Sequence, residues 1–403
     1  MAGKRLKIFN RVAALIISAA MLSVYGCNKG QTIDPDFYPT PVVNEEETTQ
    51  EGKTAENITE VSPDRVSDED ILKPERNTLK EDGEYVYNPV VIPDWILKSF
   101  ENNPQVIKVA KQALLAINNC ETEFKVDEDI KLTQDELQYV YIILYYSNPI
   151  STVAGANPTE DPNKYEISYY MRYSGGAENA EDIPTDAPAV TEVDPAEAKV
   201  TIEAFKEYVT ETINSNLTSD MSEREMAAII YKQLLTDIKL EVNDVDYYQS
   251  PDLNNYDPAE QVTGVLDKKF SSGLEFNRLY TFFMTQLHID TREVVGTSGF
   301  FTNELKDELK DMTPISSYWS WQLMQLDGEY FNCDITLEAI MFTHRYKGAE
   351  GAEPDMLYFG MSDKKRIESY KNGKSSVYYG DTFVHNAGID SKVPDCLTDL
   401  DFR

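Results

Sequence analysis

Apolar residues recur at helical spacing in five stretches, over residues 104–119, 133–148, 198–213, 222–234 and 272–287. This spacing predicts helices that each bury one face. Three of the stretches begin with the pattern Ser/Thr-x-x-Glu, at Thr133, Ser222 and Ser272. The pattern is a capping box, in which the hydroxyl and the carboxylate satisfy free N–H groups of the first helical turn. We therefore expect helices to begin directly after these three residues.

Alternation of side chains and β-prone composition predict strands over 165–173, 292–296, 318–326 and 329–336. Asp327-Gly328 separates the last two and is a strong signal for a two-residue hairpin turn. Such a turn fixes the register: Leu326 lies opposite Glu329, Trp321 opposite Asp334, and Trp319 opposite Thr336. Trp319, Trp321 and Asp334 then share one face. Cys333 points to the other face, which predicts a buried, inert thiol.

These elements predict an α+β fold. A block of helices and strands over residues 84–220 precedes a second domain over 221–403. In the second domain, the helix from 272 packs as a core helix on an antiparallel sheet.

Residues 1–26 have the organisation of a secretion signal. Four basic residues precede an apolar run over 12–22, which is shorter than the roughly 20 residues that a membrane-spanning helix needs. Gly26-Cys27 follows, and a small residue directly before a cysteine at this place resembles a bacterial lipobox. We expect Cys27 to be diacylated and to anchor the protein at the extracytoplasmic face of the cell membrane. The alternative is an ordinary signal peptide with a chance cysteine.

Residues 27–83 are predicted to be a disordered acidic tether. Residues 28–80 hold 13 acidic and 6 basic residues, with too little apolar surface to offset the entropy of ordering. The whole chain has a formal net charge of -33, and removal of residues 1–26 with their four basic residues lowers it to -37. Because nucleic acid binding requires basic surface to neutralise phosphates, this charge excludes nucleic acid as a partner.

The stretch from 287 to 336 resembles the transglutaminase-like superfamily, which shares the papain-type Cys-His-Asp arrangement. Leu287-His288-Ile289 and Val294-Val295-Gly296 are similar to the step from the family's core helix into its first strand. The next two strands match at Trp321, Leu326-Asp327-Gly328, Tyr330, Asp334 and Thr336. Upstream stretches near 132–149 and 221–234 look like those of clostridial-type lipoproteins of this family, so the resemblance covers about 125–365. It implies a papain/transglutaminase-like core helix on an antiparallel sheet.

Two of the three catalytic residues that the resemblance implies are absent. The family's cysteine falls on Gly273, or on Ser272 or Ser271 after a small shift, and residues 121–332 contain no cysteine. The family's histidine falls on Trp319, whose indole has no acceptor nitrogen. Only Asp334 stands where the family places its acid. We therefore predict no catalytic residues and no enzymatic activity, with Gly273, Trp319 and Asp334 as vestigial triad positions and Ser272 as a helix cap.

The remaining reactive side chains predict no cofactor and no metal site. His288 ends a helix, and His344 and His385 lack partners at metal-ligand spacing. The acidic loop 243–257 does not match an EF-hand, so a solvated loop is favoured over a calcium site. Cys120 is expected to pack at a helix end, and a disulfide between Cys333 and Cys396 stays open.

The sequence thus predicts a membrane-anchored surface lipoprotein whose inactive transglutaminase-like domain acts in protein or peptide binding or in scaffolding. Trp319, Trp321, Tyr330 and Asp334 would line a peptide groove, or the aromatic rings would instead fill the space of the lost triad. Two alternatives remain. One is an active hydrolase or transglutaminase with a rearranged site at Cys333 or Ser271. The other is a substrate-binding lipoprotein.

Overall fold

The structure is a computed structural model that describes residues 84–150, 154–161, 163–172, 190–240, 265–266, 269–270, 273–298, 317–346, 351–366, 377–378 and 394–400. These residues all belong to one structural unit, Leu72–Arg403. The predicted signal sequence with Cys27, the tether, the loop 243–257, Ser271, Ser272 and His385 lie outside the described residues, and so do the side chains of Trp319 and His344.

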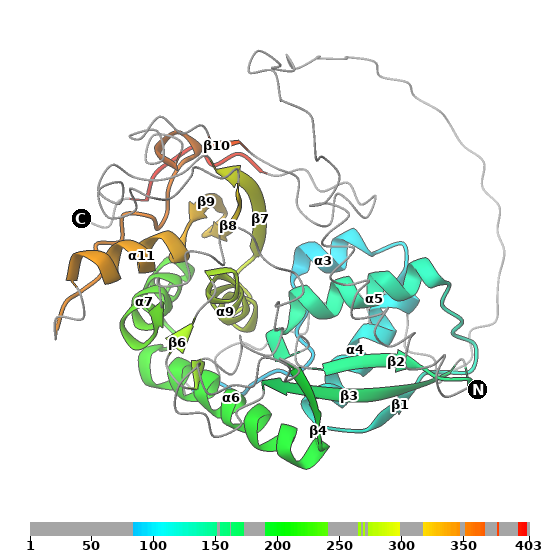
Figure 1. Cartoon of the computed structure of the whole chain (residues 1–403). Coiled ribbons are helices and arrows are strands. Elements are labelled where there is room, and N and C mark those ends of the chain that lie inside the picture. Colours follow the sequence, from blue (N-terminus) through cyan, green and yellow to red (C-terminus); the bar gives the residue numbers. More distant parts are fainter. Residues whose placement is uncertain are drawn as a thin grey trace, which may run out of the picture. The chain divides into compact units, whose positions relative to one another are not determined.

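The N-terminal part combines four helices with a four-stranded antiparallel sheet (Figure 1). Its elements are α3 (Asp94–Ser99), α4 (Pro104–Asn118), β1 (Glu123–Lys125), α5 (Gln134–Ser147), β2 (Ala154–Pro158), β3 (Lys164–Arg172), β4 (Val190–Val193) and α6 (Pro195–Asn216). Strand β3 is central and pairs with β1, β2 and β4. The alternation predicted for β3 is confirmed, because Tyr165, Ile167 and Tyr169 are buried on one face.

Local signals explain where several helices begin and end. The predicted capping boxes at Thr133 and Ser222 are both present, with each hydroxyl accepting a hydrogen bond from the N–H three residues later. Cys120 and His288 have positive φ, of 57° and 59°, directly after α4 and the core helix. The N–H groups that follow bond back to carbonyls of the last turn in both cases, which is the Schellman arrangement. The expected positions of Cys120 and His288 at helix ends are therefore confirmed.

The C-terminal part packs helices on a second antiparallel sheet, with strand order β10-β7-β8-β9. Its elements are α7 (Glu223–Asp237), β5 (Lys239–Leu240), β6 (Lys269–Phe270), α9 (Gly273–Gln286), β7 (Thr291–Ser298), β8 (Ser317–Leu326), β9 (Glu329–Cys333), α11 (Ile335–Tyr346) and β10 (Val377–Tyr378). Helix α9 contacts both β7 and β8. The fold class is α+β, with a core helix on an antiparallel sheet and a helical and strand block before it, as predicted.

The β8–β9 hairpin has the predicted register from Leu326–Glu329 to Gln322–Cys333. Asp327 and Gly328 both have positive φ, 51° and 89°, as a type I′ turn requires. The predicted strand over 329–336 is too long, however. Strand β9 ends at Cys333 and α11 begins at Ile335. The expected pairings of Trp321 with Asp334 and of Trp319 with Thr336 are therefore wrong. The ladder ends at Gln322–Cys333, Asp334 lies between β9 and α11, and Thr336 lies in the first turn of α11.

The hairpin turn is attached to α7 by an ion-pair cluster. Arg224 lies 2.9 Å from the Asp327 carboxylate and 3.2 Å from that of Glu329. Glu223 accepts a hydrogen bond from the Asp327 N–H at 2.6 Å.

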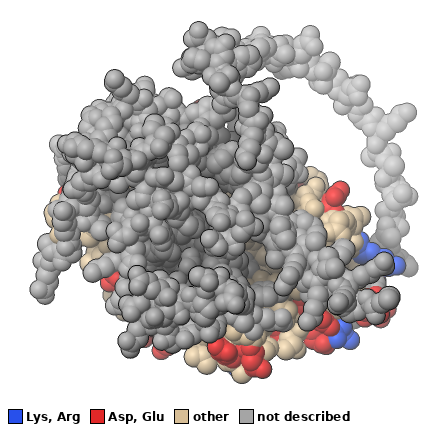
Figure 2. Space-filling model, viewed as in Figure 1, with Lys and Arg blue, Asp and Glu red and all other residues tan. Residues whose placement is uncertain are grey.

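On the face shown in Figure 2, acidic side chains lie along the described lower edge, in the region of α6. Acidic residues therefore also lie on the surface of the folded part of the chain.

Candidate functional site

The three positions predicted from the sequence as a vestigial triad lie at the start of α9, in β8 and between β9 and α11. Gly273 is the first residue of α9. Trp319 lies in β8, opposite Gly296 of β7. Asp334 stands between β9 and α11. Gly273, where the predicted resemblance places the nucleophile, is therefore the first residue of the core helix and carries no side chain.

Asp334 is the N-cap of α11. Its carboxylate accepts a hydrogen bond from the Leu337 N–H at 2.9 Å, and its carbonyl accepts from the Glu338 N–H at 3.1 Å and from the Tyr231 hydroxyl at 3.2 Å. Its own N–H donates to the Tyr358 carbonyl at 2.8 Å. The residue is fully buried. A side-chain oxygen that bonds the N3 amide is the usual helix-capping contact, so this carboxylate helps to hold a helix.

Trp321 is enclosed by the fold, with 1% of its surface exposed. Its indole N–H donates to the Asn332 side chain at 2.9 Å. The guanidinium carbon of Arg366 lies 3.5 Å from the centre of the ring, which is cation–π geometry. Arg366 is itself fully buried. Trp321 therefore fills space between β8 and the helical residues 363–366 and offers no surface to a ligand.

Tyr330 is the one predicted groove residue with a described, partly exposed side chain. Its hydroxyl donates to Asp290 at 3.2 Å, and Arg292 lies beside both groups. Burial raises the pKa of Asp290, and the charge of Arg292 and the bond from Tyr330 oppose that shift. The aromatic groove predicted from the sequence is thus split: Trp321 is buried, Tyr330 belongs to a polar cluster, and the side chain of Trp319 is not described.

Asn277 is the residue that the sequence analysis missed at this site. It lies one turn into α9 from Gly273, and its side-chain oxygen accepts a hydrogen bond from the Thr336 hydroxyl at 3.0 Å. Its carbonyl accepts from the Gln322 side chain at 3.2 Å. Asn277 therefore connects the core helix to β8 and to the start of α11. An asparagine on the mainly apolar face of a predicted helix was the available signal.

Cys333 is fully buried, as predicted from the hairpin parity. Its sulfur accepts a hydrogen bond from the Gly360 N–H at 3.2 Å. Burial raises the pKa of the thiol, so the thiolate is disfavoured. The nucleophilic form of a cysteine is the thiolate, and the contact at this sulfur is a backbone amide rather than an imidazole.

The thiols of Cys333 and Cys396 are free. A backbone segment separates them: Asn332 of β9 pairs with Met361, and on the other side of this segment Leu400 bonds Gly360 and Cys396 bonds Asp363. The disulfide that the sequence left open is therefore not formed in this structure.

Within the described part of the chain, His, Cys, Asp and Glu side chains form no group of three or more suited to a metal ion. The described helices include none that is both long and apolar enough to cross a bilayer.

No family model matches the chain, and no curated protein matches it. Among solved structures, a proposed cysteine protease from Cytophaga hutchinsonii is similar over 45% of this chain and 61% of that chain, with 9% sequence identity and a TM-score of 0.21. A similarity this distant carries no argument about the fold or the chemistry.

Proposed function

We propose that the protein is a lipid-anchored surface lipoprotein whose folded part is a non-catalytic, transglutaminase-like domain that binds a protein or peptide partner. The observation that supports this most directly is the capping role of Asp334. The one triad residue that the chain retains bonds the Leu337 N–H with its buried carboxylate. Position 319, where the resemblance places the histidine that such an acid would orient, is a tryptophan.

The thiols also argue for a non-catalytic role. A catalytic cysteine needs a lowered pKa and a nearby base. Burial instead raises the pKa of Cys120, Cys333 and Cys396, and Gly273 supplies no nucleophile. Loss of a nucleophile or its base costs roughly a millionfold in an enzyme whose triad acts as a unit.

Activity-based labelling tests this proposal. The native protein should react with neither a thiol-directed nor a serine-directed active-site probe, and it should not turn over glutamine peptides with amine donors. A Cys333→Ala variant and a Ser271→Ala variant serve as matched controls. Native labelling that either substitution abolishes would establish a rearranged catalytic site and refute the proposal.

Membrane anchoring is tested separately. Cys27→Ala should release the protein from the membrane fraction or block its processing, whereas Cys120→Ala should leave both unchanged. A Cys27→Ala protein that is processed and membrane-bound as before would refute the lipid anchor.

A further inference from the structure

Residues 84–89 are held to the fold by side-chain carboxamides. The N–H of Tyr85 donates to the Asn214 side chain at 2.7 Å, and the same amide donates back to the Tyr85 carbonyl at 3.2 Å. The Gln286 side chain repeats this arrangement, because it accepts from the Asn88 N–H at 3.1 Å and donates to the Asn88 carbonyl at 2.8 Å. Two side chains thus pair with main-chain groups as a neighbouring strand would.

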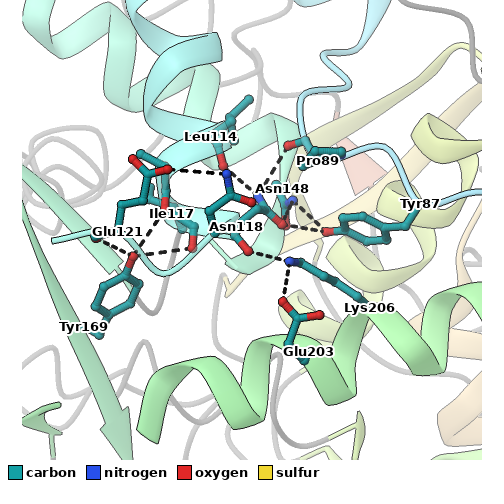
Figure 3. Close-up of polar contacts among 12 residues, drawn as sticks. Tyr87, Pro89, Leu114, Ile117, Asn118, Glu121, Asn148, Tyr169, Glu203 and Lys206 are labelled. Carbon is teal, nitrogen blue, oxygen red and sulfur yellow. Dashed lines mark hydrogen bonds and ion pairs between the residues drawn. The ribbon is translucent and has the colours of Figure 1, made fainter. Parts of the chain in front are cut away.

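A third carboxamide completes this set of contacts, as Figure 3 shows. The Asn118 amide donates to the Pro89 carbonyl at 3.3 Å, and its oxygen accepts from the Tyr87 hydroxyl at 3.1 Å. Asn148 donates to the same hydroxyl at 3.0 Å. We call Asn118, Asn148, Asn214 and Gln286 the carboxamide site. Its members come from α4, from the residue that caps α5, from α6 and from α9.

The side chains of the bound segment alternate between the interior and solvent. Tyr85 is 1% exposed and its hydroxyl donates to Gln286. Val86 is 48% exposed. Tyr87 turns inward again, with its ring centre 6.0 Å from that of Phe282. Main-chain hydrogen bonds combined with pockets for alternate side chains are how proteins bind extended peptides.

Two residues of the carboxamide site, Asn118 and Asn148, also have contacts that do not involve the segment. Asn118 also donates to the Leu114 carbonyl at 2.8 Å, and its own carbonyl accepts from Lys206 (Figure 3). The Asn148 oxygen accepts from the Ile150 N–H at 3.0 Å. These contacts fix the two amides within the helical framework, so their orientation does not depend on residues 84–89.

We propose that the carboxamide site is a docking site for an extended peptide of the form Tyr-x-Tyr-Asn, which residues 84–89 of the same chain occupy in this molecule. The inference rests on the proposed binding function and names its partner class: an extended segment with two tyrosines spaced by one residue. The occupying segment directly follows the predicted tether. When this segment is released, the carboxamide site is open to a competing segment.

The test is direct peptide binding to the unlipidated mature chain, residues 27–403 with Cys27→Ser. The probe is a fluorescein-labelled peptide with the sequence of residues 83–92, followed by fluorescence anisotropy. Tyr85→Ala weakens the internal occupant and leaves the carboxamide site intact, so this variant should bind the peptide. The parent chain and the matched control Val86→Ala should bind it at least roughly tenfold more weakly, because only a small fraction of molecules has the site open.

Adding Gln286→Ala to Tyr85→Ala should lower the affinity by roughly tenfold or more, because two main-chain bonds are lost. A folded Tyr85→Ala variant that binds no peptide, or that binds a scrambled peptide equally well, would overturn the proposal.

Hydrogen exchange on the unsubstituted protein gives a second test that needs no variant. The amides of Tyr85 and Asn88 should exchange much faster than those within α9, through release of the segment alone. Exchange of both sets at one common rate would mean that the segment opens only with the whole fold, and would refute the docking site. Labelling of the native protein by an active-site probe that Cys333→Ala or Ser271→Ala abolishes would refute the non-catalytic proposal and leave these results unaffected.

Discussion

Replacement of Asp334 distinguishes a helix cap from a relic of catalysis. Asp334→Ala removes the bond to the Leu337 N–H and leaves that donor unsatisfied in a fully buried place. Loss of a cap costs about 1 kcal/mol, and a buried unsatisfied donor costs about 1–3 kcal/mol. We expect Asp334→Ala to lower the free energy of unfolding by about 2 kcal/mol. An acid kept only to orient a missing imidazole would have no effect on stability.

Asp334→Asn is the informative companion, because asparagine caps helices about as well as aspartate. It keeps the acceptor and loses the interaction of the charge with the helix dipole, about 0.3–1 kcal/mol. Thr133→Ala removes a solvent-exposed cap of the same type and calibrates the scale at about 1 kcal/mol. Urea unfolding followed by circular dichroism gives the differences, provided that the slope m is unchanged. If Asp334→Asn costs as much as Asp334→Ala, the carboxylate acts through its charge and the capping explanation fails.

Three further predictions address the ion-pair cluster at the hairpin turn, the stability at alkaline pH and the reactivity of the thiols. Arg224→Ala should cost about 1 kcal/mol or less, because its ion pair with Asp327 is partly exposed; a loss beyond 2 kcal/mol in urea unfolding would contradict this. Burial raises the pKa of Tyr141 from 10.0 to about 12, so its neutral form contributes stability below pH 10 that is lost between pH 10 and 12, about 2–3 kcal/mol in all. Tyr141→Phe should flatten the pH dependence of unfolding there, and an unchanged curve would refute the assignment. With a small maleimide, Cys120 should react in the native protein and Cys333 only on unfolding; equal rates would show that Cys333 is accessible.

Local patterns determined which elements the sequence could predict. The capping boxes at Thr133 and Ser222 and the Asp327-Gly328 turn are complete within four residues, so the sequence contains the whole interaction. The start of α11 was missed because Ile335 and Thr336 are β-branched and continue the alternation of the strand before them. The cap at Asp334 competes with that alternation and prevails, since its carboxylate finds the Leu337 N–H.

Contacts between distant residues were beyond sequence reasoning. Arg366 covers Trp321 across 45 positions, and Asn214 pairs with Tyr85 across 129. Neither contact produces a periodic pattern in the sequence. A single polar residue on a helix or loop is normally predicted to be exposed to solvent. The burial of Trp321 could therefore be recognised only from the structure. The burial of Cys333, by contrast, was already predicted from the alternation of side chains along the hairpin.

Four of the residues that match the transglutaminase-like pattern have structural partners in this chain. They are Trp321 with Asn332, Tyr330 with Asp290, Asp334 with Leu337, and Thr336 with Asn277. Each contact joins two elements or caps one, so packing alone is sufficient reason for the chain to hold these residue types. Under the proposed resemblance, these residue types can therefore persist where catalysis is absent. The resemblance places the cysteine at Gly273 and the histidine at Trp319, and neither residue supplies a thiol or an imidazole.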